Sequence, residues 1–348
     1  MKIGITTVFK AENCGSLLQA WALREQISSL GHEVLFRDYK SPSGLKVVPA
    51  IKCVLRGRFK RAHNVIKKTL DFKKIRKKLK ITGTEQPCEA YVFGSDTLWN
   101  FDDKFFYENR GFFTGAGLDA PCYAYAMSMG STSKEKLGSL GDAVANIGKF
   151  RGIAVRDSHT MDVVSEFYPK DKLAATVDPT LLMKKEDYLK LAPADSFKYK
   201  KYLLVYYFGN IPEKTWGELK QFAESRGLSI LNVGMFDKRY DYSVVSSPEN
   251  FISAYANAEY VFTNTFHGCV FSTIFNKNFA TDGAHKKKIK GFLSEFSLSD
   301  RILSEQNGVE SVYYKPIDYG TVNELVDAAR GRSLDYLKRI LREAAVNE

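Results

Sequence analysis

The sequence predicts an α/β protein built from two Rossmann-like lobes that face each other across a cleft. Three observations favour this class. The chain has 348 residues, which is enough for two domains with sizeable cores. Short apolar segments alternate with helical ones from the first residues onward, as is typical of parallel sheets covered by helices. The alternation also runs in two series, separated by a polar stretch at 192–201.

The first series opens with a βαβ unit. An apolar strand at 3–8 is followed by a turn that contains Gly15, and then by a helix from 16 to about 30 that Gly31 ends. The same alternation continues with predicted strands at 33–37, 90–93, 122–126, 152–155 and 173–177, and with helices at about 133–150 and 158–167.

The second series begins at residue 202 and closes with a long helix rich in Ala, Leu and Arg. Its strands are predicted at 202–207, 229–233, 260–263 and 279–280, and its helices near 213–226, 248–257, 268–275 and 321–345. We therefore expect an N-terminal Rossmann-like lobe at 1–195, with a basic helical insertion near 50–80. A C-terminal Rossmann-like lobe at 196–348 should end in the long helix.

The composition excludes several classes of protein. With 44% hydrophobic and 26% charged residues, the chain is neither collagen-like, disordered nor an integral membrane protein. No run of about 18 apolar residues could span a bilayer, and the first residues lack the apolar block of a signal peptide. The five scattered cysteines favour free thiols in a reducing cytoplasm. No spacing of metal ligands occurs in the sequence, so we expect no bound metal.

The positive charge is concentrated in one segment. Lys and Arg number 51 against 40 acidic residues, and residues 56–80, with twelve basic residues and only Asp71 as an acid, account for this whole excess. Apolar residues recur there at about helical spacing, which indicates an amphipathic basic helix. The segment could be a solvated helix face or could attract an anionic membrane surface. Nucleic-acid binding ranks lowest, because no zinc-finger, RNP or helix-turn-helix motif accompanies it.

Candidate ligand-binding residues directly follow the predicted strands, because ligands of open α/β sheets bind beyond the carboxyl ends of the strands. Asn13 and Gly15 open the first helix, where free N–H groups favour an anion, although an ordinary N-cap would select the same residues. Ser95, Asp96 and Trp99 follow the third strand and could bind a sugar by hydrogen bonding and stacking. The alternative there is an Asx-turn beside a core tryptophan.

Three further candidates lie at later strand ends. Ser128 follows a strand among small residues that let a ligand approach the backbone, or that simply form a tight turn. Arg156 could bind a phosphate or carboxylate bidentately, or could pair with Asp157 at a helix start. Asn264 lies in the polar run that follows the strand at 260–263.

His267 stands in the most informative segment, T-N-T-F-H-G, at a strand–helix junction. A histidine there is presented to the cleft as a general acid or an anion ligand, although an isolated histidine is more often structural. About twenty residues later, Lys287 and Lys288 belong to a basic run that could return to the same cleft and bind a phosphate, or could be a solvated helix start.

These segments, in this order, resemble the polysaccharide pyruvyl transferase family. The matching motifs start with N-x-G-S-x-L-Q-A-x-A-L from Asn13 and G-S-D-x-x-W-N from Gly94, and continue with Y-A-x-S-x-G, V-R-D and V-D-P-T. The last is T-N-T-F-H-G, in which Thr265 stands where the family usually has Ser. At the usual R-I-x-x-L-L element the chain has K-I-x-x-F-L from Lys288, which is still cationic. The resemblance covers about residues 2–300.

The resemblance implies a two-lobed fold like that of the GT-B glycosyltransferases. It implies phosphoenolpyruvate as the donor, with no cofactor, and a sugar of a capsule, an exopolysaccharide or a lipid-linked precursor as the acceptor. The product would be a cyclic pyruvate ketal, with phosphate released. A sugar-nucleotide-dependent GT-B glycosyltransferase is the main alternative, and a basic membrane- or RNA-binding module is the non-enzymatic one.

The same resemblance assigns expected roles to the candidate residues. His267 would protonate the donor's methylene carbon or polarise its phosphate, and Asp96 would orient or deprotonate the acceptor. Phosphoenolpyruvate is expected to bind Arg156, Lys287, Lys288, Asn13, Gly15 and Ser128, and the acceptor is expected to contact Ser95, Trp99 and Asn264. We expect a cytoplasmic protein with no nucleic-acid partner, whose residues 56–80 could bring it to a lipid-linked acceptor at the inner face of the membrane.

Overall fold

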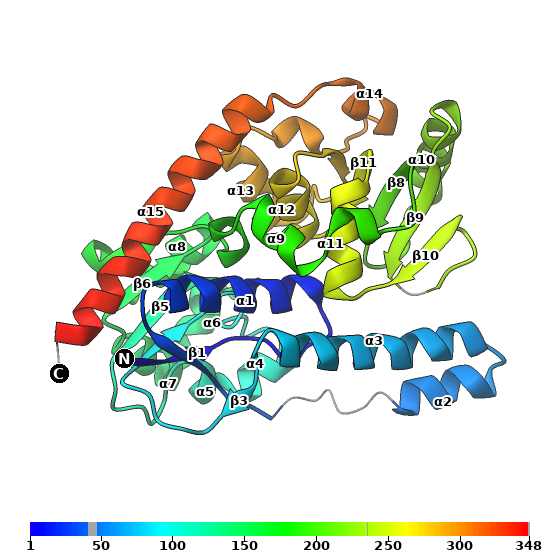
Figure 1. Cartoon of the computed structure of the whole chain (residues 1–348). Coiled ribbons are helices and arrows are strands. Elements are labelled where there is room, and N and C mark those ends of the chain that lie inside the picture. Colours follow the sequence, from blue (N-terminus) through cyan, green and yellow to red (C-terminus); the bar gives the residue numbers. More distant parts are fainter. Residues whose placement is uncertain (41–46, 235, 347–348) are drawn as a thin grey trace.

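Two parallel β-sheets with helices around them form the protein (Figure 1). The computed structural model describes residues 1–40, 47–234 and 236–346. All strand pairs of both sheets are parallel, and the strand order crosses over in each sheet, which is the result of repeated βαβ connections. The predicted α/β class with two Rossmann-like lobes is therefore confirmed.

The first sheet has seven strands in the order β3-β2-β1-β4-β5-β6-β7. Its central strands are buried on both faces, as the continuous apolar runs of a covered parallel sheet require. The strands are β1 (Lys2–Thr6), β2 (Glu33–Arg37), β3 (Gly83–Thr84), β4 (Ala90–Phe93), β5 (Cys122–Met127), β6 (Gly152–Val155) and β7 (Leu173–Ala175).

The helices that accompany this sheet begin with α1, whose start the sequence places well. They are α1 (Cys14–Ser29), α4 (Lys104–Glu108), α5 (Arg110–Phe113), α6 (Lys134–Gly138), α7 (Gly141–Ile147), α8 (Ser158–Val164) and α9 (Lys185–Leu191), with 3-10 turns at Lys170–Lys172 and Pro179–Leu182. The single helix predicted at 133–150 is wrong, because the backbone leaves the helical region at Leu140, between two glycines, and separates α6 from α7.

The second sheet has five strands in the order β10-β9-β8-β11-β12. They are β8 (Tyr202–Tyr206), β9 (Ser229–Gly234), β10 (Tyr242–Val245), β11 (Tyr260–Thr263) and β12 (Asn278–Thr281). The helices around it are α10 (Glu213–Ser225), α11 (Pro248–Asn257), α12 (Phe266–Ile274), α13 (Lys287–Glu295) and α14 (Val309–Tyr314), with 3-10 turns at Ala194–Ser196 and Ser299–Arg301.

The basic segment forms a helical hairpin, α2 (Val47–Leu55) and α3 (Phe59–Lys78), that extends from the first lobe (Figure 1). The turn between the helices contains Gly57, whose φ of 65° suits glycine. The prediction of one amphipathic helix is thus corrected to two helices. Only part of the apolar face of α3 is covered, since Phe72 and Ile75 are buried while Phe59 and Leu70 are exposed.

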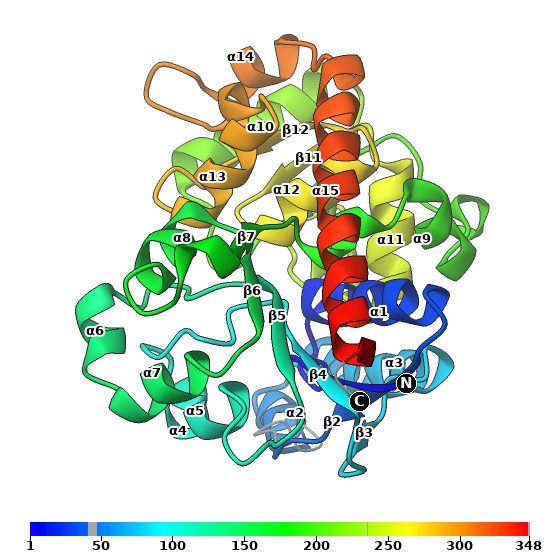
Figure 2. The same ribbon diagram turned by 90° about the vertical axis from the view of Figure 1, so that its left-hand side faces the viewer.

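The last helix, α15 (Tyr319–Val346), starts at the second lobe and ends on the first (Figure 2). The hydroxyl of Tyr336 donates to the carbonyl of Ala124 in β5 at 3.0 Å, and the hydroxyl of Ser333 accepts from the backbone N–H of Val177 at 3.0 Å. The helix therefore holds the two lobes together. The boundary that the sequence predicts at residue 195 falls in the connection between α9 and β8 and stays a prediction.

The carboxyl ends of the two sheets face each other. Gly15, at the start of the helix that follows β1, packs against the ring of His267, at the start of the helix that follows β11. The thiol of Cys14 likewise lies 3.3 Å from the hydroxyl of Ser246, which follows β10. Loops of both lobes thus meet at one place, where ligands of such sheets bind.

Candidate active site

His267 is fixed at the second position of α12 by hydroxyl groups around it. The Oγ1 of Thr265 accepts from the backbone N–H of Gly268 at 2.9 Å and so caps the helix. Thr263 donates to the carbonyl of Tyr206 at 2.7 Å, which ties the end of β11 to that of β8. A Cβ on Gly268 would collide with the Oγ1 of Thr263, so only glycine lets this helix start so close to its strand.

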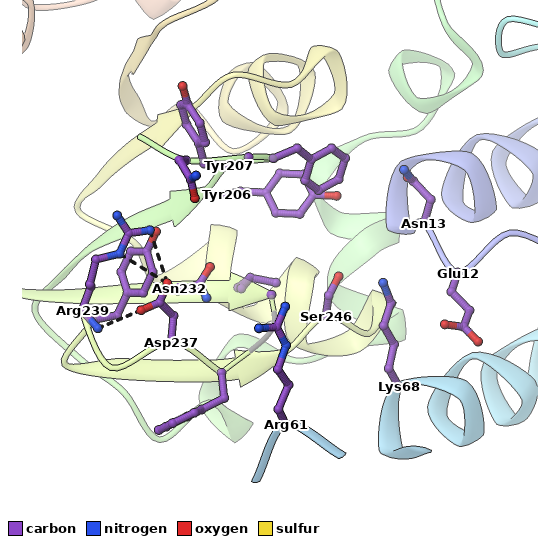
Figure 3. Close-up of a pocket in the computed structure, with 17 residues that line it drawn as sticks. Glu12, Asn13, Arg61, Lys68, Tyr206, Tyr207, Asn232, Asp237, Arg239 and Ser246 are labelled. Atoms are coloured by element: carbon purple, nitrogen blue, oxygen red, sulfur yellow. Dashed lines mark hydrogen bonds and ion pairs between the residues drawn. The ribbon is translucent and has the colours of Figure 1, made fainter. Parts of the chain in front are cut away.

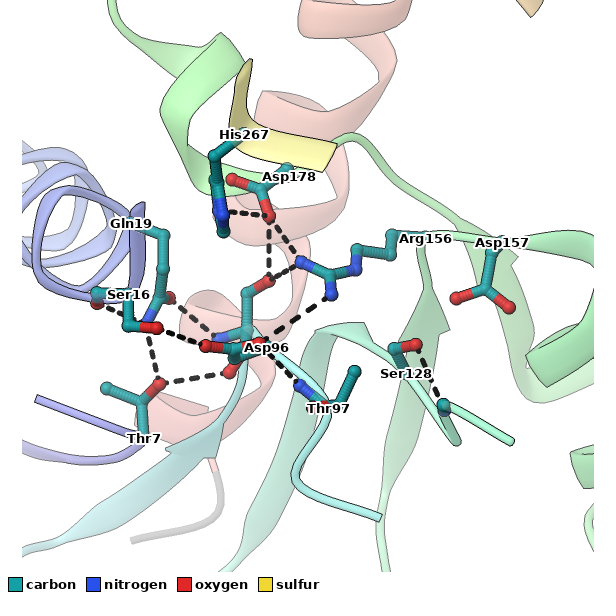
Figure 4. Close-up of polar contacts among 12 residues, drawn as sticks. Thr7, Ser16, Gln19, Asp96, Thr97, Ser128, Arg156, Asp157, Asp178 and His267 are labelled. Carbon is teal, nitrogen blue, oxygen red and sulfur yellow. Dashed lines mark hydrogen bonds and ion pairs between the residues drawn. The ribbon is translucent and has the colours of Figure 1, made fainter. Parts of the chain in front are cut away.

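Asp178 is the buried centre of the polar network in Figure 4. Its Oδ2 lies 2.5 Å from Nη1 of Arg156, 3.2 Å from the Oγ of Ser95 and 3.7 Å from Nε2 of His267. Burial alone would raise the pKa of Asp178. The positive charges of His267 and Arg156 outweigh it and hold that pKa far below its usual range. An ionised carboxylate at this place faces the imidazole of His267, with Oδ2 and Nε2 3.7 Å apart.

Arg156 lies between two carboxylates and against an aromatic ring. Its Nη2 is 3.8 Å from Oδ1 of Asp96, and its guanidinium lies 4.7 Å from the ring centre of Phe266. Although buried, its Nε and Nη2 have no hydrogen-bond partner among the described residues. Buried donors are rarely left in this way, so both are available to an anionic ligand.

Asp96 faces Arg156 from the loop after β4. Its Oδ2 accepts from the hydroxyl of Ser16 at 2.6 Å, and its Oδ1 accepts from the N–H of Thr97 at 2.9 Å. Burial would raise the pKa of Asp96, but the charges of Arg156 and His267 lower it below its usual range. The backbone of Asp96 has a φ of 83°, a conformation that a non-glycine residue keeps only where its surroundings impose it.

The start of α1 completes the network from the first lobe. Gly15 lies so close to the ring of His267 that a Cβ there would overlap the imidazole. One turn later, the amide of Gln19 donates to the hydroxyl of Thr7 at 2.9 Å and accepts from the N–H of Ser95 at 3.2 Å. These contacts hold the loop after β4 in place.

One cavity, of about 450 Å³, is lined by Asp157, the neighbour of Arg156 in the chain, and we call it the lysine cavity. It is lined by loops that follow β4, β5 and β6 and by the start of α13, including Ser128, Asp157, Lys287 and Lys288. Burial lowers the pKa of Lys288, and the nearby charge of Arg156 lowers it further. An anion in this cavity would relieve the repulsion between these cations.

A second cavity, of about 490 Å³, opens beyond the start of α1, and we call it the aromatic cavity (Figure 3). Its walls come from α3, from the loop before α1, and from the ends of β8, β9 and β10. In the first sheet, β1 lies between β2 and β4. The lysine cavity lies at the ends of β4, β5 and β6, and the aromatic cavity lies on the other side of β1. The network of His267 is therefore located between the two cavities.

The structure corrects the three predicted acceptor contacts. Trp99 is fully buried and its indole N–H donates to the carbonyl of Phe113 at 2.9 Å, so it cannot stack on a sugar. Ser95 is also fully buried and belongs to the network of Asp178. The amide of Asn264 is occupied with the backbone of Phe208, from whose N–H it accepts at 2.9 Å and to whose carbonyl it donates at 2.8 Å.

Asn13 and Cys14, the two residues before Gly15, do not contribute to the network around Arg156 and His267. The side chain of Asn13 caps α1 by accepting from the N–H of Ser16 at 3.2 Å, and it lies on the aromatic cavity rather than beside Arg156. Burial raises the pKa of the Cys14 thiol to about 11, so this cysteine stays protonated at neutral pH and is unsuited to nucleophilic catalysis.

Sequence reasoning missed the central carboxylate. Asp178 stands in the V-D-P-T motif three residues after the end of β7, which was a usable signal, because a polar residue near a strand end is expected at the ligand edge. Within the ranges that the structure describes, no group of three His, Cys, Asp or Glu side chains is arranged to hold a metal ion. Nor does any helix of those ranges have the length and apolar character to cross a membrane.

Solved structures with a similar fold are known. The UDP-GlcNAc 2-epimerase of Methanocaldococcus jannaschii, in complex with UDP-GlcNAc and UDP, has a TM-score of 0.53 and 11% identity over 99% of this chain and 100% of its own. That of Neisseria meningitidis, bound to UDP-GlcNAc, has a TM-score of 0.54 and 8% identity over 100% of both chains. These similarities support the GT-B-like fold and, at such identity, concern the fold alone. No curated protein sequence gives a significant match.

The sequence itself matches one family. The model of that family, described as polysaccharide pyruvyl transferase, matches residues 13–281. This range is most of the chain and includes Gly15, Asp96, Arg156, Asp178 and His267. The chain therefore belongs to the polysaccharide pyruvyl transferase family.

Proposed function

We propose that the protein transfers the enolpyruvyl group of phosphoenolpyruvate to a sugar of a surface polysaccharide or of its lipid-linked precursor. Two hydroxyls of the sugar would then form a cyclic pyruvate ketal, and phosphate would leave. The observation that carries this proposal is the convergence of Arg156, Asp178 and His267 from both lobes on one buried network. A transferase that uses a small, highly anionic donor such as phosphoenolpyruvate would need such cations and a proton donor.

In this proposal, Arg156 and the lysines of the lysine cavity hold the donor between them. Phosphoenolpyruvate carries a phosphate and a carboxylate, and the Nε and Nη2 of Arg156, which have no hydrogen-bond partner among the described residues, can donate to one of them. Lys287 and Lys288 line the lysine cavity and would hold the other. A volume of about 450 Å³ lies within the ordinary range for small-molecule sites.

The reaction divides into two steps. In the first, protonated His267 gives its proton to the methylene carbon of the donor while a sugar hydroxyl forms a bond to the neighbouring carbon. The proton of that hydroxyl returns to His267, and Asp96, kept ionised by Arg156, orients the acceptor. In the second step, another hydroxyl of the same sugar forms the second C–O bond. The bond to the phosphate oxygen breaks, and the proton of this hydroxyl leaves with the phosphate.

Mass spectrometry of lipid-linked glycans incubated with phosphoenolpyruvate tests this function. We expect the mass of a pyruvate ketal on the glycan, with phosphate released and no nucleotide sugar required. His267→Ala should lower turnover by about 10²–10⁴-fold, the usual contribution of general acid–base catalysis, while its melting temperature stays close to that of the native protein. Near-normal turnover of this variant would remove His267 from the mechanism. Sugar transfer from a nucleotide sugar, without uptake of phosphoenolpyruvate, would instead establish the glycosyltransferase alternative.

We further propose that the protein acts at an anionic membrane surface through the α2–α3 hairpin. The support is a combination of charge and exposed apolar area. Leu55 is 80% exposed and Phe59 is 67% exposed, on either side of the turn between the helices. Each basic residue near an anionic surface contributes about 1 kcal/mol, so the hairpin has enough cations for measurable attraction.

Co-sedimentation with vesicles tests the membrane proposal. The protein should bind vesicles that contain phosphatidylglycerol, bind less at high salt, and ignore vesicles of phosphatidylcholine alone. Lys73→Gln with Lys74→Gln should weaken binding at least fivefold. The matched pair Lys214→Gln with Lys220→Gln, on α10, removes the same charge elsewhere and should leave binding unchanged. Equal loss in both pairs would reduce the effect to net charge and reject the hairpin as the binding element.

A further inference from the structure

We infer that the aromatic cavity is a binding site for a glycosyl diphosphate. Arg61 and Lys68 of α3 would hold the diphosphate, and the aromatic side chains at the end of β8 would hold the sugar. The inference rests on the proposed function, because it assigns this cavity to the acceptor and leaves the lysine cavity to phosphoenolpyruvate.

The two cations come from one face of one helix. Arg61 and Lys68 are seven residues apart, close to two full turns of 3.6 residues, so both side chains leave α3 on the same side. Figure 3 shows them extending from α3 into the cavity. Among the described residues, Arg61 forms no ion pair or hydrogen bond, so its guanidinium is available to a ligand.

The acidic residues on the walls are already engaged. Glu12 accepts from the hydroxyl of Thr69 at 2.7 Å and lies near the positive charge of Arg76. Asp237 is paired with Arg239 at 3.3 Å. Neither carboxylate forms an ion pair with Arg61, so the cavity offers a guanidinium that a doubly charged diphosphate would neutralise.

The sugar part has an aromatic platform. Phe208 is 56% exposed, which is unusual for so large an apolar side chain beside a cavity. Its backbone is held by both ends of the Asn264 amide, and its ring packs edge-on against Tyr206 with the centres 5.3 Å apart. A ring held in this way, and more than half exposed, suits the C–H face of a hexose. Asn264 therefore serves the acceptor by positioning Phe208 rather than by touching the sugar.

The cavity also leads to the reacting group. Asn13 is part of its wall, and two residues further along, Gly15 touches the ring of His267. In the other direction, the aromatic cavity adjoins a second hollow beside the α2–α3 turn. The two have three lining residues in common, Arg61, Phe236 and Asp237. A glycosyl diphosphate in the cavity would thus place its sugar toward His267 and its other end toward the exposed Phe59 of the turn.

The same diphosphate chemistry has two sources, a polyprenyl lipid and a nucleoside. Calorimetry separates these two sources. It uses citronellyl-diphospho-N-acetylglucosamine as the lipid probe and UDP-N-acetylglucosamine as the nucleotide probe, each with and without inorganic phosphate. We expect at least one of these probes to bind, and Arg61→Gln with Lys68→Gln to raise its Kd at least tenfold. The matched pair Lys67→Gln with Lys74→Gln removes two charges from another side of α3 and should leave the Kd unchanged.

A third variant tests the sugar platform. Phe208→Ala should weaken the glycosyl diphosphate at least fivefold while leaving the binding of inorganic diphosphate unchanged. Tighter binding of the citronellyl probe would identify a lipid source, and tighter binding of the UDP probe a nucleotide source. If neither probe binds, or if both lysine-containing pairs weaken binding equally, the inference is overturned. Titration of phosphoenolpyruvate into the native protein and the same variants keeps the two proposals apart. If the native protein does not bind phosphoenolpyruvate, only the proposed function is overturned.

Discussion

The carboxylate of Asp178 brings together side chains from three loops. Ser95 follows β4, Arg156 follows β6 and His267 follows β11, and each lies within 3.7 Å of the same oxygen. Removing ions from water costs free energy that a buried pair only partly recovers, so such a cluster is a poor source of stability. Its benefit is geometric, because it fixes the direction of Arg156 and of His267 before any substrate binds.

We predict that Asp178→Asn destabilises the protein in a pH-dependent way. At pH 7 the loss should be roughly 3–5 kcal/mol, because Arg156 then keeps a buried, uncompensated charge. The pKa of Asp178 is lowered in the folded state, so its stabilisation is fully present above the unfolded value of about 3.9 and is lost as the pH falls toward the folded value. The difference from the native protein should therefore shrink below about pH 4.

Urea unfolding at several pH values measures this difference. Asp102→Asn, at an exposed position, is the matched control and should cost little at any pH. A gap between the native protein and Asp178→Asn that stays constant from pH 7 to pH 3 would contradict the assigned ionisation.

Gly15→Ala should impair catalysis while leaving the fold intact. The added methyl group would overlap the imidazole of His267, so the ring must move away from Asp178. We expect at least a tenfold lower kcat together with a lower melting temperature, because the overlap reaches the Cβ of His267 and not only the end of its ring. Gly217→Ala, which adds the same methyl group to α10 in open space, should leave kcat unchanged. Native kcat in Gly15→Ala would show that the ring position of His267 is unimportant.

At the scale of single residues, sequence reasoning works where backbone geometry alone decides. Arg156 and His267 follow strand ends, so the fold class places them at the ligand edge. Trp99 and Asn264 also follow strands, but neighbouring packing decides their direction. Trp99 turns into the core to reach the carbonyl of Phe113, and Asn264 turns back to Phe208. No pattern in the sequence carries these long-range partners.

Helix α12 shows how one hydroxyl can control the position of a functional element. We predict that Thr265→Ala costs about 1 kcal/mol of stability, because the N–H of Gly268 loses its cap. Since the first turn of α12 carries His267, kcat should also fall. Thr265→Ser keeps the Oγ and should restore both stability and kcat. Thermal unfolding and steady-state kinetics of the two variants measure the effect, and equal behaviour of alanine and serine would rule out a capping role.

The regular elements were predictable and the interrupted ones were not. Strands such as β4 and β8 are apolar on both faces, so their sequence is unambiguous. The break between α6 and α7 lies at Leu140, an apolar residue that fits a helical pattern, and β3 has only two residues. The α2–α3 hairpin was hidden because its amphipathic pattern continues through the turn at Gly57.

At the scale of the whole molecule, α15 connects the two lobes, and the sequence of neither lobe alone predicts this connection. We expect Tyr336→Phe to lower the free energy of unfolding by about 1 kcal/mol, because the hydrogen bond to Ala124 is lost from a buried site. Tyr314→Phe, at a tyrosine that is 62% exposed, is the control and should change little. Urea unfolding measures both variants, and an unchanged midpoint for Tyr336→Phe would mean that α15 contributes little to the first lobe.

The two lobes themselves were predictable, and their contact surface was not. Two series of alternating segments indicate two sheets, but whether and where the carboxyl edges meet depends on close approaches such as that of Gly15 to His267. The same is true of the aromatic cavity, whose walls combine α3 with the ends of β8 and β9, more than 130 residues away in the chain.

Helix α15 also has a consequence for how the chain matures on the ribosome. Every strand of the first lobe is synthesised before residue 176, yet the helix that hydrogen-bonds to β5 and to Val177 begins only at Tyr319. While residues 176–318 are synthesised, the first sheet therefore lacks the part of its apolar cover that α15 supplies. A nascent chain in that condition is a natural client for a chaperone, and premature termination before α15 should yield aggregation rather than a working half-enzyme.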